Sequence, residues 1–188
     1  MPNVLVLLTG SIACFKACTL ISRLVQAGVT VQTVATPAAL RFVGTATLEG
    51  LSGRPVFTDV FEEGRALDHI ALARAADLAL VCPATANTIN QLAAGIAGDP
   101  VGTLFLAWEL ESKPWWIAPA MNAWMWKHPA TAASIATLKS WGVRVLDPVE
   151  GPHACGETGP GRLAEPELIT AEILKTLGAR PPSAASEM

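Results

Sequence analysis

Short apolar runs alternate with stretches of helical periodicity along the first part of the chain. Val4–Leu8 is continuously apolar, as in a strand that is buried on both faces of a sheet. Apolar residues then recur with a helical period over Ile12–Ala27, and Gly28 suits the end of that helix. Val29–Ala35 predicts a second strand. A strand, a helix and a strand within about 35 residues have the size of a βαβ unit.

The same alternation continues toward the C-terminus. The later strands are predicted at Asp77–Cys82, Pro114–Ala118 and Val143–Leu146, and the later helices at Ala84–Ala97, Pro129–Trp141 and Glu165–Leu177. This order predicts a single-domain α/β fold of the Rossmann-like, flavodoxin-like class, with a mostly parallel sheet covered by helices on both faces. We assign residues 1–178 to that domain. Residues 179–188 have no apolar pattern and are expected to form a disordered tail.

Composition narrows the class of protein. Of 188 residues, 51% are hydrophobic and 15% are charged, which rules out an intrinsically disordered chain. The net charge of −3 argues against binding to a nucleic-acid backbone. No apolar run reaches the roughly 18 residues of a membrane-spanning helix. The N-terminus lacks the basic region of a signal peptide, so we expect a cytoplasmic protein with free thiols.

Metal binding is not expected. The three histidines lie far apart in the sequence, and neither CxxC nor HExxH spacing occurs. Cys14, Cys18 and Cys82 fall in a predicted helix and at the end of a predicted strand, so we interpret them as packing residues.

Sheets of this class bind ligands beyond the carboxyl ends of their strands. The loops that follow the predicted strands therefore contain the candidate site. They are Thr9–Ala13, Thr36–Ala39, Pro83–Thr88, Pro119–Trp126 and Glu150–Arg162.

Two of these loops lead into helices with small or polar residues. Gly10 and Ser11 form either an anion site made of backbone N–H groups and a hydroxyl, or a tight turn with Ser11 as the helix cap. The spacing matches neither GxGxxG nor GxxxxGK[ST], so a dinucleotide site or a P-loop is disfavoured. Thr85, Asn87 and Thr88 crowd another helix start, although capping requires only one of them. A polar ligand at the helix start would use the rest. The small residues that continue this helix leave room for another backbone or a flat ring, or they reflect close helix packing.

The last two loops have unusual compositions. Two methionines and two tryptophans surround Asn122 in Pro119–Trp126, and an amide in such a setting needs a partner. Asn122 either binds a carboxylate or holds the loop. Gly151–Arg162 contains four glycines and two prolines, which excludes a helix or a central strand and is typical of a flap over a substrate. Cys155 in this flap is either inert or a proton donor.

His69 precedes a short helical stretch. A lone histidine in such a place is more often structural than catalytic. The neighbouring Asp68 suits a helix cap.

Taken together, these segments resemble the flavin-containing cysteine decarboxylases over about residues 3–177. PAMNAWMW at Pro119–Trp126 matches every fixed position of that family's PxMNxxMW signature. ACGETGPGR at Ala154–Arg162 looks like its substrate-recognition flap, and GSIA at Gly10–Ala13 resembles its flavin phosphate turn. His69 is placed like its active-site histidine. Leu163 stands where methionine is usual, a conservative apolar change.

The resemblance implies that FMN is the cofactor of a flavoprotein domain at residues 1–178. The positions that match cofactor-binding residues are Gly10, Ser11, Ile12, Thr36, Thr85, Ala86, Asn87, Thr88 and Ala120. Those that match substrate-binding residues are Met121, Asn122, Ala154 and Cys155.

Within the family, the resemblance is to the members of coenzyme A synthesis. It implies decarboxylation of 4′-phosphopantothenoyl-L-cysteine to 4′-phosphopantetheine through thioaldehyde and ene-thiol intermediates. His69 would be the base, Asn122 would hold the substrate carboxylate and Cys155 would be the late proton donor. It also implies a homo-oligomer, a trimer or a multiple of trimers, with the flavin near a subunit interface. A separate phosphopantothenate–cysteine ligase is an implied partner.

Two alternatives stay open. One is an oxidative peptidyl-cysteine decarboxylase of the lantibiotic-modifying type, whose members lack the flap cysteine. The other is a non-catalytic, flavin-binding regulatory subunit, which has no need of His69, Asn122 and Cys155 together.

Overall fold

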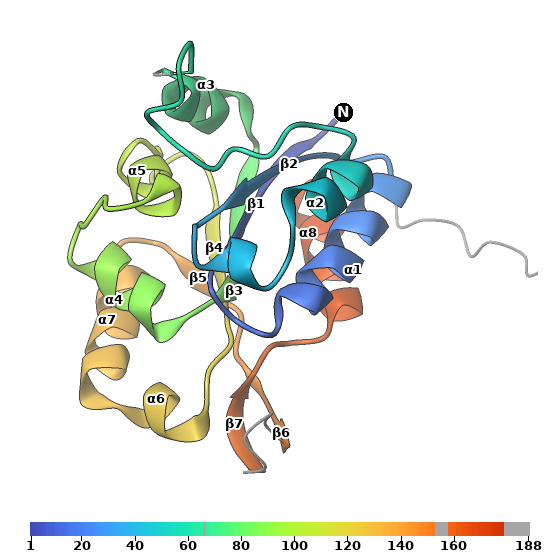
Figure 1. The fold of residues 1–188 in the computed structure, drawn as a ribbon. Helices are drawn as coiled ribbons and strands as arrows, with labels where there is room; N and C mark the ends of the chain where they lie inside the picture. The colour runs from blue at the N-terminus through green and yellow to red at the C-terminus, as the bar shows by residue number, and fades with distance from the viewer. Residues whose placement is uncertain (66, 153–157, 179–188) are drawn as a thin grey trace, which may run out of the picture.

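The fold is a five-stranded parallel sheet covered on both faces. The computed structural model describes residues 1–65, 67–152 and 158–178. Its main sheet has the strand order β2-β1-β3-β4-β5 (Figure 1). The strands are β1 (Asn3–Leu8), β2 (Thr30–Ala35), β3 (Leu78–Ala84), β4 (Trp115–Pro119) and β5 (Arg144–Val145). Each predicted strand is present, and the predicted α/β class is confirmed.

Helices cover both faces of this sheet. The α-helices are α1 (Cys14–Gln26), α2 (Thr45–Ser52), α3 (Asp68–Ala75), α4 (Ala86–Ala93), α5 (Pro100–Leu106), α6 (Ala123–Lys127), α7 (Pro129–Ser140) and α8 (Pro166–Thr176), and a short 3₁₀ helix spans Ala39–Arg41. In Figure 1, α1, α2 and α8 lie on one side of the strands, and α4, α5 and α7 lie on the other.

The alternation of side chains along β1 explains these two layers. Successive residues of a strand point to opposite faces. Val4, Val6 and Leu8 accordingly pack into the core beneath α1, whereas Leu5 and Leu7 pack into the core on the opposite face. All five are fully buried. The continuous apolar run in the sequence is therefore two interleaved core surfaces.

One predicted helix is shorter in the structure than the sequence predicts. The sequence predicts a helix over Ala84–Ala97, but Ala84 ends β3 and α4 stops at Ala93. Gly95 takes a positive φ of 67°, and the Ile96 N–H donates to the Gln91 carbonyl, which turns the chain out of the helix. The side chain of Asp99 then caps the unpredicted α5 by accepting from the Gly102 N–H at 2.9 Å.

A separate two-stranded antiparallel sheet lies beyond the carboxyl ends of the main strands. It consists of β6 (Val149–Pro152) and β7 (Thr158–Arg162), with Glu150 opposite Pro160. Figure 1 places this hairpin beside α6. The described part of Gly151–Arg162 is thus neither a helix nor a central strand, as predicted, but the sequence did not predict the pairing.

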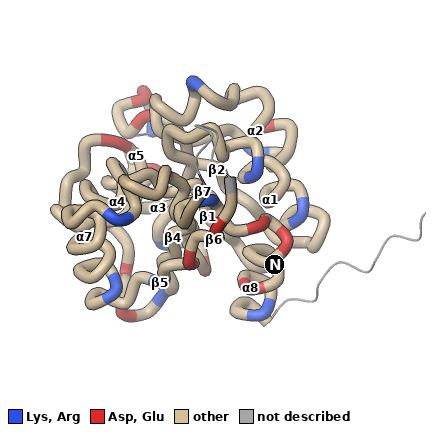
Figure 2. Tube along the Cα trace, turned by 90° about the horizontal axis from the view of Figure 1, so that it is seen from below, with Lys and Arg blue, Asp and Glu red and all other residues tan. Residues whose placement is uncertain are grey.

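Two further observations concern the molecule as a whole. Seen toward the face at which the main strands end, lysines and arginines are scattered among acidic residues and do not gather in one patch (Figure 2). No helix among the described residues is long and apolar enough to cross a membrane. The predicted tail at 179–188 lies outside the described residues.

Candidate functional site

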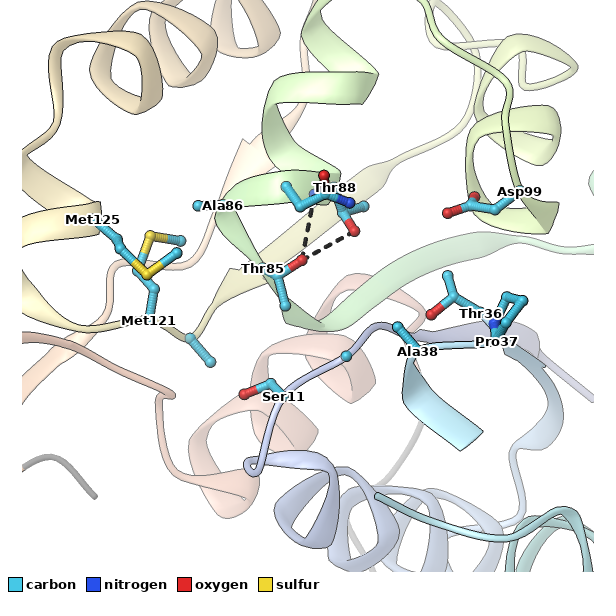
Figure 3. Close-up of a pocket in the computed structure, with 13 residues that line it drawn as sticks. Ser11, Thr36, Pro37, Ala38, Thr85, Ala86, Thr88, Asp99, Met121 and Met125 are labelled. Carbon is cyan, nitrogen blue, oxygen red and sulfur yellow. Dashed lines mark hydrogen bonds between the residues drawn. The ribbon is translucent and has the colours of Figure 1, made fainter. Parts of the chain in front are cut away.

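A cavity of about 590 Å³ opens at the carboxyl ends of the main strands, within the usual size range of small-molecule sites. It is lined by Gly10, Ser11, Thr36, Pro37, Ala38, Thr85, Ala86, Asn87, Thr88, Asp99, Ala120, Met121 and Met125. In Figure 3, Met121 and Met125 lie on one side, Asp99 lies on the other, and Thr85 and Thr88 lie between them.

Most of the predicted cofactor positions line this one cavity. They come from the ends of β1, β2, β3 and β4, which are far apart in the sequence. Ile12 is the exception, because it is exposed and does not line the cavity. Met121, predicted to bind substrate, does line it.

The turn after β1 approaches the turn after β2 very closely. A Cβ atom at Gly10 would lie 2.7 Å from the Cβ of Ala38, so no other residue fits there without a shift. Ser11 accepts from the Ala13 N–H at 3.2 Å and from the Cys14 N–H, through its carbonyl, at 3.1 Å. Ser11 therefore holds the turn, while the capping position of α1 is Ala13, which makes no side-chain cap.

The turn after β3 is held by hydroxyl groups. Thr85 caps α4 by accepting from the Thr88 N–H at 3.3 Å, and its hydroxyl donates to the Thr88 hydroxyl at 3.1 Å. Thr9 donates to the Pro83 carbonyl at 2.7 Å and accepts from the Thr85 N–H at 3.1 Å. Two of the three polar side chains thus serve the turn itself. Asn87 is exposed at the cavity wall and is free of this capping arrangement.

Asn122 holds the loop before α6. Its side-chain Oδ1 accepts from the Met125 N–H at 2.8 Å, which makes Asn122 the cap of that helix. Of the two roles open from the sequence, loop support is therefore observed. Asn122 does not itself line the cavity, although Ala120, Met121 and Met125 from the same segment do. The amide nitrogen of Asn122 keeps its donor capacity for a ligand.

The hairpin packs directly on this segment. The Met121 N–H donates to the Gly161 carbonyl at 2.9 Å. A Cβ atom at Gly161 would lie 2.3 Å from the Met121 carbonyl oxygen, and one at Gly159 would lie 3.0 Å from the Ala123 Cβ. Gly161 also has a positive φ of 125°, which disfavours any other residue. The flap glycines therefore permit close contact with the cavity wall.

His69 is not brought to the cavity within one chain. It lies in the first turn of α3, is partly buried and does not line the cavity. The other end of α3 is fastened where the main strands begin: the Asn3 side chain donates to the Ala75 carbonyl at 3.0 Å, and the Lys113 ammonium donates to the Ala76 carbonyl at 3.2 Å. Figure 1 accordingly shows α3 toward that edge. Among the described residues, Nδ1 of His69 is buried without a hydrogen-bond partner.

The proposed cap at Asp68 is wrong. Leu67 occupies the capping position of α3, and Asp68 is already the first helical residue. Its carboxylate instead accepts from Arg65 Nε at 2.7 Å, and the same guanidinium pairs with Glu62 at 2.9 Å.

The cysteines of the core are packing residues, as predicted. Cys14 and Cys82 are buried, and Cys18 is partly buried. Burial raises the pKa of all three thiols, so they are protonated at neutral pH. Ala154 and Cys155, the remaining predicted site residues, lie outside the described residues. In the described ranges, no three His, Cys, Asp or Glu side chains gather to hold a metal ion.

The sequence missed Pro37, Ala38, Asp99 and Met125 as wall residues. Three of them lay in segments already singled out: Pro37 and Ala38 in the loop after β2, and Met125 in the signature. Asp99 carried a readable signal, since Asp before Pro marks a helix start.

A family model described as "Flavoprotein" matches residues 1–178. The chain therefore belongs to the flavoprotein family. It is 48% identical over 169 residues to the "Coenzyme A biosynthesis bifunctional protein CoaBC" of Bacillus subtilis, covering 89% of this chain and 41% of that one. It is 40% identical over 177 residues to the "Probable phosphopantothenoylcysteine decarboxylase" of Streptococcus mutans, covering 93% and 98%. The chain thus spans about two fifths of the bifunctional relative.

Solved structures agree with this family membership. A cysteine-to-serine variant of "PPC decarboxylase", complexed with pantothenoylaminoethenethiol, has a TM-score of 0.85 and 29% identity, covering 95% of this chain and 99% of that one. "The FMN binding protein AtHal3" has a TM-score of 0.82 and 30% identity, covering 94% and 97%. The resemblance to flavin-containing cysteine decarboxylases is confirmed.

The contact between Gly161 and Met121 generates a test. We expect Gly161→Ala to lower the free energy of unfolding by at least about 2 kcal/mol, because the new Cβ meets a carbonyl oxygen at a strained φ. Gly50→Ala is the matched control, since Gly50 lies in α2 with no atom near its added Cβ; it should be neutral or stabilising by up to about 1 kcal/mol. Urea unfolding measures both. Equal stability of the two variants would contradict the packing described.

Proposed function

We propose that the chain catalyses FMN-dependent decarboxylation of 4′-phosphopantothenoyl-L-cysteine to 4′-phosphopantetheine in coenzyme A biosynthesis. The observation that carries this proposal is the position of the signature segment Pro119–Trp126. Residues of this segment line the cavity, and the segment also contacts the β6–β7 hairpin. The names of the bifunctional relative and of the Streptococcus mutans relative support the same substrate and pathway.

The cavity fits FMN. The lining consists largely of small and hydroxyl-bearing residues, and the turn before α1 offers backbone N–H groups and a helix start to a phosphate. Among the described residues, no lysine or arginine lines the cavity, so the backbone and hydroxyl groups would make the contacts with the phosphate. We assign cofactor contacts to Gly10, Ser11, Thr36 and Ala120, and to the turn Thr85–Thr88; Ile12 would contribute through its backbone. Bound FMN supplies reversible acceptance of two electrons.

Substrate contacts are assigned to the signature and the flap. Asn122 would hold the substrate carboxylate through its amide nitrogen, because its oxygen is engaged with the Met125 N–H. Met121 would contact the substrate from the cavity wall. Ala154 would contact the substrate from the flap, and Cys155 would protonate the ene-thiol carbon late in the reaction.

His69 would act as the base, since an imidazole exchanges protons near neutral pH. Because His69 does not line the cavity of its own chain, we infer that a second copy supplies it, in a trimer or a multiple of trimers. Large apolar side chains that are exposed in one chain support this assembly. Phe61 and Leu67, near α3, are 90% and 75% exposed, and Trp124, beside the cavity, is 73% exposed.

We further propose that the enzyme works in the cytoplasm and receives its substrate from a phosphopantothenate–cysteine ligase. The bifunctional name of the Bacillus subtilis relative supports a coupled second activity.

The proposed reaction has a direct test. Purified protein is expected to show flavin absorption and to release one CO₂ and one 4′-phosphopantetheine for each 4′-phosphopantothenoyl-L-cysteine consumed, measured by mass spectrometry. A cysteine-terminated peptide serves as the competing substrate. Flavin-loaded protein that leaves the small substrate intact would contradict the proposal. So would protein that converts only the peptide, to a product two hydrogens lighter than the simply decarboxylated peptide.

Cys155→Ser tests the late proton transfer. A serine hydroxyl is a much weaker acid than a thiol, so this variant should release CO₂ but accumulate the ene-thiol. Product masses distinguish the ene-thiol from 4′-phosphopantetheine, which is two hydrogens heavier. Cys18→Ser is the control, because Cys18 is a packing residue of α1, and it should give the full product. A normal yield of 4′-phosphopantetheine from Cys155→Ser would overturn the role of this residue.

Subunit complementation tests the source of His69. His69→Asn and Asn122→Ala should each lower kcat/KM by at least about 100-fold, the usual loss for a group that transfers a proton or orients the substrate. Mixed assemblies of the two variants should recover between about a quarter and a third of the wild-type activity. Random pairing joins an intact histidine to an intact cavity at about one site in four, and purified mixed trimers have one such site in three. The mixture is made by co-expression with two affinity tags. Mixed assemblies as inactive as the parent variants would show that both residues act within one chain.

A further inference from the structure

One carboxylate connects the flap hairpin to the helix that follows the first cavity turn. Glu165 lies just before α8, and both of its oxygens accept from Lys16 Nζ at 2.9 Å. Its Oε1 also accepts from Arg162 Nη2 at 3.0 Å. Lys16 belongs to α1 and Arg162 is the last residue of β7, so Glu165 joins three elements.

Lys16 occupies an unfavourable place for a cation. It lies in the first turn of α1, where the helix dipole disfavours positive charge, and its side chain is only 12% exposed. Both hydrogen bonds described for its ammonium go to Glu165. The hydrogen bond from Lys16 holds the pKa of Glu165 below its usual value, so the carboxylate is ionised at neutral pH.

Arg162 is integrated into the hairpin. A Cβ atom at Gly151 would lie 3.2 Å from Arg162 Nη1, so the guanidinium crosses β6 where a glycine leaves space. The preceding residue, Gly161, accepts the backbone hydrogen bond from Met121 on the cavity wall. Arg162 therefore links Glu165 to the point at which the hairpin contacts that wall.

We propose that Glu165 is a positioning residue. By binding both Lys16 and Arg162, it fixes the hairpin relative to α1, and so relative to the cavity turn that precedes α1 and the signature segment that the hairpin contacts. Its effect on turnover rests on the proposed function. Its effect on the hairpin does not.

The chain offers a matched control. Arg23 of α1 and Glu167 of α8 also join these two helices, at 2.5 Å, but their side chains are 43% and 51% exposed. This pair does not include the hairpin. Glu167→Gln therefore removes an ion pair between α1 and α8 and leaves the Glu165 network in place.

Hydrogen exchange of the flavin-loaded protein tests the structural part. In Glu165→Gln, the amides of residues 149–151, 158, 159, 161 and 162 should exchange about fivefold faster than in the wild type, as expected when a charge-assisted contact is lost. Glu167→Gln should leave them unchanged. Arg162→Met removes only the hairpin arm of the network and should give the same acceleration. Unchanged exchange in Glu165→Gln and Arg162→Met, or an equal change in Glu167→Gln, would overturn the proposal.

Kinetics of the same variants test the consequence for the site. Glu165→Gln should raise KM for 4′-phosphopantothenoyl-L-cysteine about tenfold with a smaller change in kcat, because a loosely held flap weakens substrate binding before chemistry. Glu165→Asp, which keeps the charge, should restore part of the loss. An unchanged KM in Glu165→Gln would overturn the link to the site. If the wild type does not convert the substrate, the proposed function fails, and the exchange comparison still decides the role of Glu165.

Discussion

The parallel direction of the main strands is the constraint on which the candidate site depends. Because β1, β2, β3 and β4 run the same way, the turns that follow them meet at one edge of the sheet. That edge gathers residues as distant in sequence as Gly10 and Met125 around one cavity. The strands can run parallel only because helices cross over both faces and bury them, which is why the inner strands β1, β3 and β4 are almost continuously apolar. Core composition and site location therefore have one cause.

Small residues decide how closely the parts of this edge approach one another. Gly10 permits contact between the turns after β1 and β2, and Gly161 permits contact between the hairpin and the signature segment. Hydroxyl groups of Thr9 and Thr85 then satisfy the backbone where β3 passes into α4. The cavity wall thus consists largely of backbone and short side chains. Backbone N–H dipoles of such a wall would make the phosphate contact that we propose for the cofactor.

Strong local patterns in the sequence predict most of the fold and most residues of the cavity lining. The buried strands, the helices α1, α7 and α8, and most of the wall positions follow from apolar periodicity and from the signature segment. The break at Gly95 was missed, because a helical pattern of small residues continues across it. The cap at Asp68 was assigned wrongly, since Arg65 competes for that carboxylate. The contact of Lys16 with Glu165 joins residues 149 positions apart and leaves no local pattern. The location of His69 away from the cavity has a similar origin, because tertiary packing at the start of the strands determines where α3 lies.

The contact between Gly10 and Ala38 also constrains how the chain can evolve. With 2.7 Å between an added Cβ and the existing one, the two positions share a single small volume. A side chain at position 10 would force the backbones of the two turns apart and widen the edge of the cavity. Position 10 is therefore expected to remain glycine for as long as the two turns must stay together.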